Sequence, residues 1–412
     1  MGTSMFEGIR TAEISNRDLA NTMNRVRRLT AGGYSSYEQN EEALSKLLSR
    51  IMKLSHEEKE WYVYFDALYY RIYLASRSGD SRTIVRYAEV YYRDSALYMD
   101  RALPDYPGTD MAKLNVWICI YIRNAYESYC EIDDQKMDAF MKLFEETVHK
   151  YGQRFWYYRG EMMLAILYRD KALMEHGRKQ FEKYEKEMDS CYICGHIECL
   201  AYEIMMDRLE RAEELLLAYR DRRIPKRHQW CYRYCQRAEA QSLYADALEY
   251  SLDLGKPEAF RYFYEKYWLT LPRDCQRGER ERWYCNLSIY ACAIAGNFDA
   301  LETDCAEAQE DIDRMETYSA VARIKAALKW RCYFALLDRS GVHEVKIRLP
   351  EGHNAGQEAM ADAADAVPTL EVSRYMERIA DENGEKFSKA RAKYDYGLTR
   401  ASYLECAGLL NF

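Results

Sequence analysis

The sequence predicts an all-α protein built from antiparallel helix pairs (an α–α superhelix), and three observations predict that fold. The chain has 19 glycines and 7 prolines among 412 residues, a low content that is typical of long helices joined by short turns. Apolar residues recur three and four positions apart, which places them on one face of a helix. Turn residues recur at a near-constant interval: Asp133, Asp170 and Asp207 lie 37 residues apart, and Gly255 and Gly296 lie 41 apart. An interval near 40 residues indicates a helical repeat.

The first 53 residues are expected to form a helical leader. Ser15–Leu29 has the pattern of one helix, a glycine pair ends it, and a second helix follows Ser36. Ser55 and Glu58 then match a capping box, in which a serine and a glutamate three residues later satisfy the first amide groups of a helix. The sequence therefore predicts that the repeat region begins with a helix at Ser55.

The repeat region is predicted to span residues 54–340. Its first helix carries an apolar face and ends at Gly79, and a return helix follows over Ser81–Asp100. The apolar face consists of Trp61, Phe65, Leu68, Tyr69 and Ile72. The next three pairs are Met111–Glu131 with Gln135–Tyr151, Gln153–Arg169 with Ala172–Met188, and Ser190–Met206 with Leu209–Arg222.

Small residues follow the predicted turns at similar distances: Ala212 after Asp207, Ala259 after Gly255 and Ala300 after Gly296. Together with the period and the helix pairs, they make residues 55–340 resemble tetratricopeptide repeats. The resemblance implies a right-handed superhelix whose concave face, lined by the first helix of each pair, holds peptides or partner proteins. A HEAT-like or another helix-pair repeat is the alternative.

The end of the chain departs from this pattern. Residues 341–368 are expected to form an irregular insertion with at most one short strand near 344–349, where apolar and basic residues alternate. Residues 369–412 are predicted to be two capping helices, Thr369–Asn383 and Glu385–Leu409, separated at Gly384. Their expected core positions are Leu370, Tyr375, Ile379, Leu398, Tyr403 and Leu404.

Composition and net charge limit the cellular location and the kind of partner that we expect. The chain contains no run of eighteen apolar residues, so no membrane span is expected, and the N-terminus lacks the apolar segment of a secretory signal. The thirteen cysteines are then expected to be reduced thiols in a cytoplasmic protein. A net charge of −8 and a pI of about 5.6 argue against a nucleic-acid partner.

Four cysteines in the centre of the chain form a candidate zinc site. Cys191 and Cys194 are three residues apart, and Cys231 and Cys235 are four apart. The two pairs are offset by 40 and 41 residues, which matches the repeat period, so a set of four thiolates is the metal-binding hypothesis. Spare ligands nearby are Cys199, His196 and His228.

Two considerations oppose the zinc site. Free cysteines are commonly packed in the core as small apolar residues. In straight helices, moreover, the two pairs would be misaligned by roughly 6 Å, because they lie at different distances from their turns.

Other catalytic patterns fail at specific positions. His196 and Glu198 follow the cysteine pair, whereas zinc deaminases place their histidine and glutamate before a Pro-Cys-x-x-Cys motif. His56 lacks the second histidine of a zincin, because position 60 is Glu60. Glycine-rich phosphate loops are absent from the sequence. The sequence therefore assigns no catalytic residue and no cofactor other than zinc.

Two surface features suggest partner binding. The 38 tyrosines are numerous enough to line a binding face, since tyrosine combines a large ring with a hydroxyl donor; the alternative is that they are wedges between helices. A basic edge can dock an acidic peptide, or it is a solvated loop at helix ends. The basic-edge candidates are Arg220, Arg222, Arg223, Lys226 and Arg227.

The leading functional prediction is a non-catalytic helical-repeat scaffold that binds a protein or peptide partner in its concave groove. One alternative is a peptide-ligand sensor of bacterial type without its own DNA-binding domain, because residues 1–53 do not resemble a helix-turn-helix. The other is a zinc-stabilised domain or an enzyme centred on the four cysteines. The sequence does not predict the oligomeric state.

Overall fold

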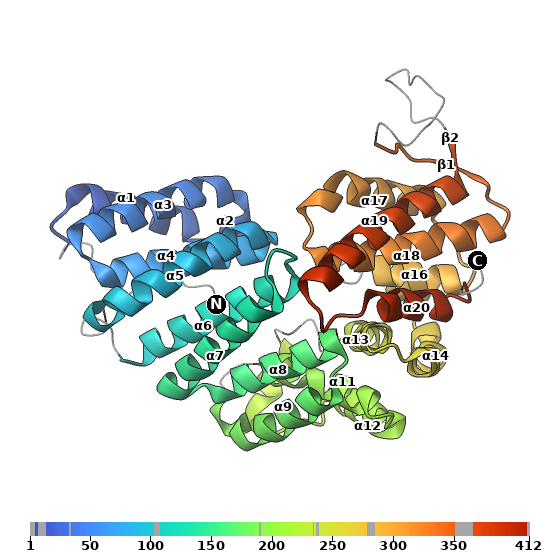
Figure 1. Ribbon diagram of the computed structural model, residues 1–412, viewed down its shortest axis with the longest axis horizontal. Helices are drawn as coiled ribbons and strands as arrows, with labels where there is room; N and C mark the ends of the chain where they lie inside the picture. The colour runs from blue at the N-terminus through green and yellow to red at the C-terminus, as the bar shows by residue number, and fades with distance from the viewer. Residues whose placement is uncertain are drawn as a thin grey trace. The chain divides into compact units, whose positions relative to one another are not determined.

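The structure, a computed structural model, describes residues 5–6, 14–32, 34–102, 108–188, 191–233, 235, 239–277, 285–350 and 366–409. Within these residues the chain is helical apart from turns, loops and one two-stranded sheet (Figure 1). The predicted all-α fold class is therefore confirmed. The chain forms two units: the first contains Met1–Tyr129 and Gln135–Tyr157, and the second contains Cys130–Asp134 and Tyr158–Phe412.

The first unit is a series of helices in which neighbours along the chain pack together. Helix α1 packs on α3, α3 packs on α4, and α4 contacts both α5 and α6. The helices are α1 (Arg17–Thr30), α2 (Tyr34–Gln39), α3 (Glu41–Glu58), α4 (Trp61–Ser78), α5 (Ser81–Ala102), α6 (Gly108–Ser128) and α7 (Asp134–Tyr151).

The second unit continues the helix pairs, and its boundary with the first unit falls within α8, whose residues 154–157 belong to the first unit. Its α-helices are α8 (Arg154–Tyr168), α9 (Lys171–Tyr184), α10 (Tyr192–His196), α11 (Glu198–Met205), α12 (Leu209–Arg220), α13 (Ala240–Asp253), α14 (Pro257–Lys266), α15 (Arg273–Arg277), α16 (Cys285–Ile294), α17 (Leu301–Arg314), α18 (Ala320–Arg339), α19 (Thr369–Ala390) and α20 (Tyr396–Cys406). Its 3-10 helices include η3 (Glu185–Glu187), η4 (Lys226–Arg233), η6 (Trp268–Thr270) and η7 (Met315–Thr317).

One hydrogen-bonded turn recurs at the ends of the first helices of the pairs. A residue one or two positions after the helix has a positive φ, and the next amide donates to the carbonyl five residues earlier, as Arg208 N does to Glu203 O at 2.9 Å and Asn297 N does to Cys292 O at 2.9 Å. This is the Schellman motif, which satisfies carbonyls that would otherwise lack a donor at the helix end. The positive-φ residues are Gly79, Arg169, Asp207, Gly255, Gly296 and Gly341.

The predicted turns at Asp207, Gly255 and Gly296 are therefore confirmed. The turn predicted at Asp170 is centred one residue earlier, at Arg169. Asp170 is the N-cap of α9, where its carboxylate accepts a hydrogen bond from Leu173 N, which is the usual role of an aspartate at a helix start.

The first helices of consecutive pairs contact one another within each unit. Helix α4 contacts α6 in the first unit, and in the second α11 contacts α13, α13 contacts α16, and α16 contacts α18. Side-by-side packing of the same helix from successive pairs is the arrangement of a helical repeat.

A buried ion network joins two of these helices. Lys329 donates to Glu249 at 2.7 Å, and Lys325 lies 2.6 Å from Asp253 and 3.7 Å from Glu249. Arg169 Nε also donates to the carbonyl oxygen of Asp253 at 2.8 Å. Since isolated buried charges are costly, this pairing fixes α13 against α18 in one register.

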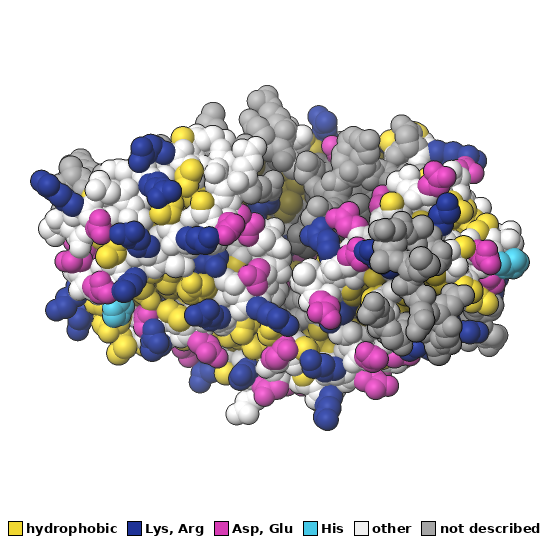
Figure 2. All heavy atoms as spheres, turned by 90° about the horizontal axis from the view of Figure 1, so that it is seen from above, with side chains coloured by type: hydrophobic (Ala, Val, Ile, Leu, Met, Phe, Trp, Pro, Cys, Tyr) yellow, Lys and Arg dark blue, Asp and Glu magenta, His cyan; other side chains and the backbone are white. Residues whose placement is uncertain are grey.

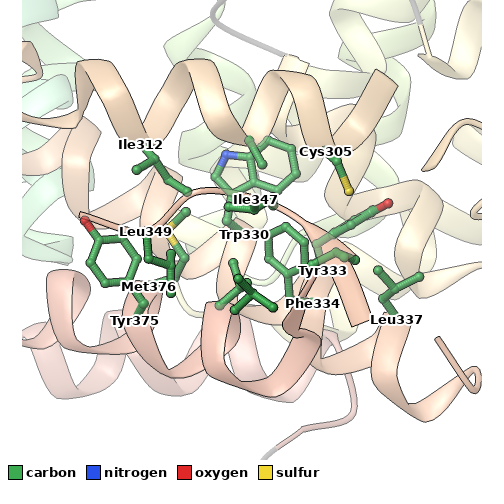
Figure 3. Packing of buried hydrophobic residues seen from close by; sticks show 14 of the residues in the cluster. Cys305, Ile312, Trp330, Tyr333, Phe334, Leu337, Ile347, Leu349, Tyr375 and Met376 are labelled. Carbon is green, nitrogen blue, oxygen red and sulfur yellow. The ribbon is translucent and has the colours of Figure 1, made fainter. Parts of the chain in front are cut away.

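The last helices enclose a separate apolar cluster. Figure 3 shows side chains of α17, α18, α19 and the segment after α18 meeting in it, with Trp330 and Phe334 of α18 at its centre. Trp330 donates its indole N–H to Asp311 at 2.7 Å, so the buried ring keeps a polar partner.

The predicted strand near 344–349 is present and has a partner strand. Val345, Ile347 and Leu349 are buried in the cluster. Strand β1 (Glu344–Lys346) pairs antiparallel with β2 (Ala366–Pro368). Strand β2 was not predicted, because three residues ending in proline carry no alternating pattern.

The helix start predicted at Ser55 is wrong. Ser55 lies inside α3, fully buried, and its hydroxyl donates to Ile51 O at 2.6 Å rather than capping a helix. Helix α3 ends at Glu58, the following Lys59 has a φ of 63°, and α4 starts at Trp61. The apolar face of α3 continues through Ser55, and this burial outweighs the local capping pattern.

The helix end predicted at Gly384 is also wrong. Gly384 is buried within α19, which continues to Ala390. The ring of Tyr396 packs against it so closely that a Cβ on residue 384 would lie 2.2 Å from the ring. This glycine therefore permits close packing between α19 and α20 rather than ending a helix. Leu398, an expected core residue, is 54% exposed.

Replacing Gly384 tests this contact. Gly384→Ala is expected to destabilise the protein by about 1–3 kcal/mol, because the added methyl group displaces the Tyr396 ring. Urea denaturation followed by circular dichroism measures the effect. In a Tyr396→Ala background the same change should be neutral or stabilising by up to about 1 kcal/mol, since alanine favours a helix more than glycine. Equal losses in both backgrounds would contradict the proposed contact.

Asp94 gives the first unit a predicted pH dependence. This buried carboxylate of α5 accepts hydrogen bonds from Arg93 and from Tyr64 of α4. Burial alone would raise the pKa of Asp94, but the bonds from Arg93 and Tyr64 outweigh burial and hold that pKa below its usual value of 3.8. Its stabilising effect is therefore present above the unfolded-state pKa and is lost as the pH falls through the lower folded-state pKa.

The corresponding measurement is the denaturation midpoint as a function of pH. Asp94→Asn is expected to lower the midpoint at neutral pH and to flatten its decline below about pH 4. Asp100→Asn, an exposed position of the same helix, is the control. An acid decline in Asp94→Asn as steep as in the unaltered protein would rule out this linkage.

Candidate functional site

The central cysteines lie where the repeat pattern is interrupted. The helix predicted over Ser190–Met206 is broken at Ile197 into α10 and α11. Cys191 immediately precedes α10 with an extended backbone (ψ 123°), and Cys194 lies within α10. The zinc hypothesis placed Cys235 on a straight helix. The structure instead places it in the connection between η4 and α13.

Three of the four predicted ligands come together. The sulfur atoms of Cys191, Cys194 and Cys235 all lie within 4.8 Å of one another, and those of Cys194 and Cys235 are 3.3 Å apart. All three side chains are half-buried. Cys231 belongs to η4, but its side chain lies outside the described residues. The misalignment expected for straight helices does not arise, because Cys235 lies in an irregular segment that can approach α10.

The three thiols interact strongly. Hydrogen bonding with Cys194 and then with Cys235, together with burial, raises the pKa of Cys191. A raised pKa keeps the Cys191 thiol protonated. A divalent cation reverses that preference, since thiols that ligate a metal are deprotonated.

The spare ligands lie outside this group of three thiols in the described part of the chain. His196 Nδ1 lies 2.9 Å from Tyr192 O, and the Tyr192 ring stacks on the His196 ring at 3.8 Å. Arg227 donates to Nε2 of His228 at 2.9 Å, and burial followed by the Arg227 charge lowers the pKa of His228. Burial raises the pKa of Cys199 to about 12. In the described part of the chain, the metal-type group contains none of these three residues.

Glu198 is held by an ion pair. Arg159 of α8 donates to both of its oxygens, at 2.8 and 2.7 Å, and the Glu198 side chain is only 4% exposed. A carboxylate with both oxygens bound to a guanidinium is a structural group that joins consecutive repeats. The superficial likeness of His196 and Glu198 to a deaminase motif therefore has no counterpart in the geometry.

The basic edge runs from the last residue of α12 into η4. Arg220 lies 2.7 Å and Arg223 3.6 Å from the carboxylate of Asp221, so one acid partly offsets this edge. Arg222 covers the ring of Tyr232 at 5.2 Å. Lys226 and Arg227, like the other three basic candidates, are exposed.

Trp230 extends this edge and was missed in the sequence. Its side chain is 47% exposed. It follows Arg227 by three residues in η4, a spacing that places both on one side of a 3-10 helix. The signal that could have identified Trp230 is its position three residues after Arg227, in a segment that follows Pro225.

The first unit carries a row of aromatic rings, which we call the aromatic row: Tyr69 and Tyr73 of α4, Trp117 and Tyr121 of α6, and Trp156 of α8. Ring centroids are 5.9 Å apart for Tyr73 and Tyr121, 5.9 Å for Tyr121 and Trp117, and 5.3 Å for Trp117 and Trp156. All except Trp156 are half-buried. The sequence showed the excess of tyrosine but not which rings meet, because that depends on how α4 and α6 pack.

Comparison of the chain with known proteins and structures identifies no relative. No protein-family model, curated protein or solved structure matches this chain. Among the described helices, none is both long enough and apolar enough to cross a lipid bilayer.

Breaking the ion pair beside the cysteines is a direct test of its structural role. Arg159→Met is expected to destabilise the second unit by about 3–5 kcal/mol, because it leaves the buried Glu198 carboxylate without a partner. Urea denaturation gives the free energy of unfolding. Arg159→Met combined with Glu198→Leu should recover most of the loss, since no charge then remains buried. A loss below about 1 kcal/mol in the single variant would show that the pair is not needed.

Proposed function

We propose that this chain is a non-catalytic, cytoplasmic helical-repeat scaffold that binds an extended peptide segment of a protein partner. The observation that carries the proposal is the aromatic row. The row crosses the first helices of consecutive pairs, which is the position that the resemblance to tetratricopeptide repeats assigns to partner binding.

The chemistry of the row suits an extended peptide. Tyrosine and tryptophan rings offer flat apolar faces, and their O–H and N–H groups can donate hydrogen bonds at the ring edge. A proline-rich or otherwise extended segment presents apolar side chains together with carbonyl groups that are not used in secondary structure. Aromatic-lined surfaces recognise such segments in several protein modules.

One described pocket is too small to hold a drug-sized ligand. The pocket bordered by Phe260, Tyr264 and Ile294 has a volume of about 160 Å³, which is smaller than the roughly 300–1,000 Å³ typical of sites for drug-sized ligands. On the face shown in Figure 2, basic and acidic side chains are interspersed, whereas a nucleic-acid track presents mainly basic groups.

Selection from a random peptide display library on the immobilised protein tests the proposal. The enriched peptides are expected to share a motif with proline or aromatic residues, and synthetic versions should bind with calorimetrically measurable affinity. Trp117→Ala and Tyr73→Ala should each weaken binding about 10- to 100-fold, as expected for central aromatic contacts of an interface.

Matched variants separate binding from folding. Tyr73→Phe and Tyr121→Phe keep the rings and should retain most of the affinity, while circular dichroism verifies that the alanine variants are folded. Tyr202→Ala, a half-buried tyrosine of α11, should bind as the unaltered protein does. A library that yields no shared motif, or peptides that bind folded Trp117→Ala equally well, would refute the aromatic row as the binding face.

A further inference from the structure

We propose that Cys191, Cys194 and Cys235 bind one zinc ion and that this ion is structural: it ties the connection between α12 and α13 to α10. The sequence offers Cys231 as a fourth ligand. The inference is independent of the peptide-binding proposal, because the aromatic row belongs to the first unit and the thiols to the second.

The spacing of the sulfur atoms fits tetrahedral coordination. With Zn–S bonds of about 2.3 Å, the sulfurs of a tetrahedral site lie about 3.8 Å apart. The separation of 3.3 Å between Cys194 and Cys235, and the limit of 4.8 Å for the set of three, lie on either side of that value. Shifts of an ångström or less therefore convert the thiol cluster into a zinc site.

A disulfide explains the cluster less well. A bond between Cys194 and Cys235 would use two sulfurs and leave Cys191 beside them without a role. A single disulfide uses two thiols, whereas a metal site uses three or four protein ligands. The cluster joins the start of α10 to a segment 41 residues later in the chain, so a metal accounts for all three thiols.

Cys231 is the fourth ligand that the sequence offers. It precedes Cys235 by four residues and lies in η4, a helix that contacts α10. Neither nearby imidazole belongs to the group of clustered ligand atoms in the described part of the chain; His228 accepts from Arg227, and Nδ1 of His196 lies 2.9 Å from the Tyr192 carbonyl. Four cysteine ligands leave no position for water, which is typical of a structural rather than a catalytic zinc site.

A bound ion would stabilise a weakly packed connection between two helices. In its described residues the connection between α12 and α13 contains η4 and no α-helix, and few of these side chains, Ile224 and His228 among them, are buried. A segment with so few buried contacts opens easily. A metal bond to Cys235 holds it in place, and with it the basic edge and Trp230, which then form a fixed surface instead of a fluctuating one.

Elemental analysis of the full chain, purified without a metal-affinity tag and under reducing conditions, is the primary test. About one zinc per chain is expected. Cys191→Ser, Cys194→Ser and Cys235→Ser should each reduce the content at least tenfold, while Cys275→Ser, a half-buried cysteine outside the cluster, should leave it unchanged. Removing zinc with a chelator should increase proteolytic cleavage between residues 221 and 239 and spare the first unit.

Cobalt substitution and mass spectrometry decide the ligand set and the alternatives. The unaltered protein loaded with Co²⁺ should show the visible absorption of a tetrahedral thiolate site, and Cys231→Ser should abolish or strongly shift it. An unchanged spectrum in Cys231→Ser would overturn the four-cysteine assignment. Reduced protein that neither contains zinc nor takes it up from added Zn²⁺, or a native Cys194–Cys235 disulfide found by mass, would overturn the site itself. Peptide binding to the aromatic row should persist in all cysteine variants, so failure of one proposal is distinguishable from failure of the other.

Discussion

The turn that closes first helices such as α4, α11 and α13 is the constraint on which the rest of this structure depends. A residue with positive φ lets two amides reach back to the carbonyls at the helix end, as at Asp207 and Gly255, and the chain then reverses direction. Because the turn is short, the second helix must pack beside the first. The exposed apolar side of that pair is covered by the next pair, which is why consecutive first helices such as α11 and α13 are in contact.

Polar groups set the register between neighbouring helices. Arg159 with Glu198 joins helices of adjacent pairs, and Tyr64 with Asp94 joins the two helices of one pair. Lys329 with Glu249 joins α18 to α13, which lies two pairs earlier, and all three use largely buried hydrogen bonds. Apolar faces alone tolerate sliding, whereas a buried charge has one satisfactory partner position. The pairs therefore stack in a defined order, and in the first unit this order brings the rings of α4 and α6 into one row.

The repeat is interrupted where the candidate metal site lies. The helix break at Ile197 and the long connection before α13 remove the regular helix packing that stabilises the other pairs. Those same irregularities allow Cys235 to approach α10, and they place Trp230 and the basic edge at the surface. The loss of helix packing and the convergence of thiols are thus two consequences of one departure from the repeat.

The sequence by itself determined the all-α class, the positions of turns such as Gly255 and Gly296, and the matched spacing of the central cysteines, because periodicity and turn residues act over a few neighbouring positions. Only the tertiary structure decided that Ser55 and Gly384 lie inside helices, that Leu398 is exposed, and that Cys235 approaches α10 from an irregular segment. It also selected the tyrosines that form a row. Each of these outcomes depends on which surfaces meet across tens of residues, and packing between distant segments outweighs local propensity where the two conflict.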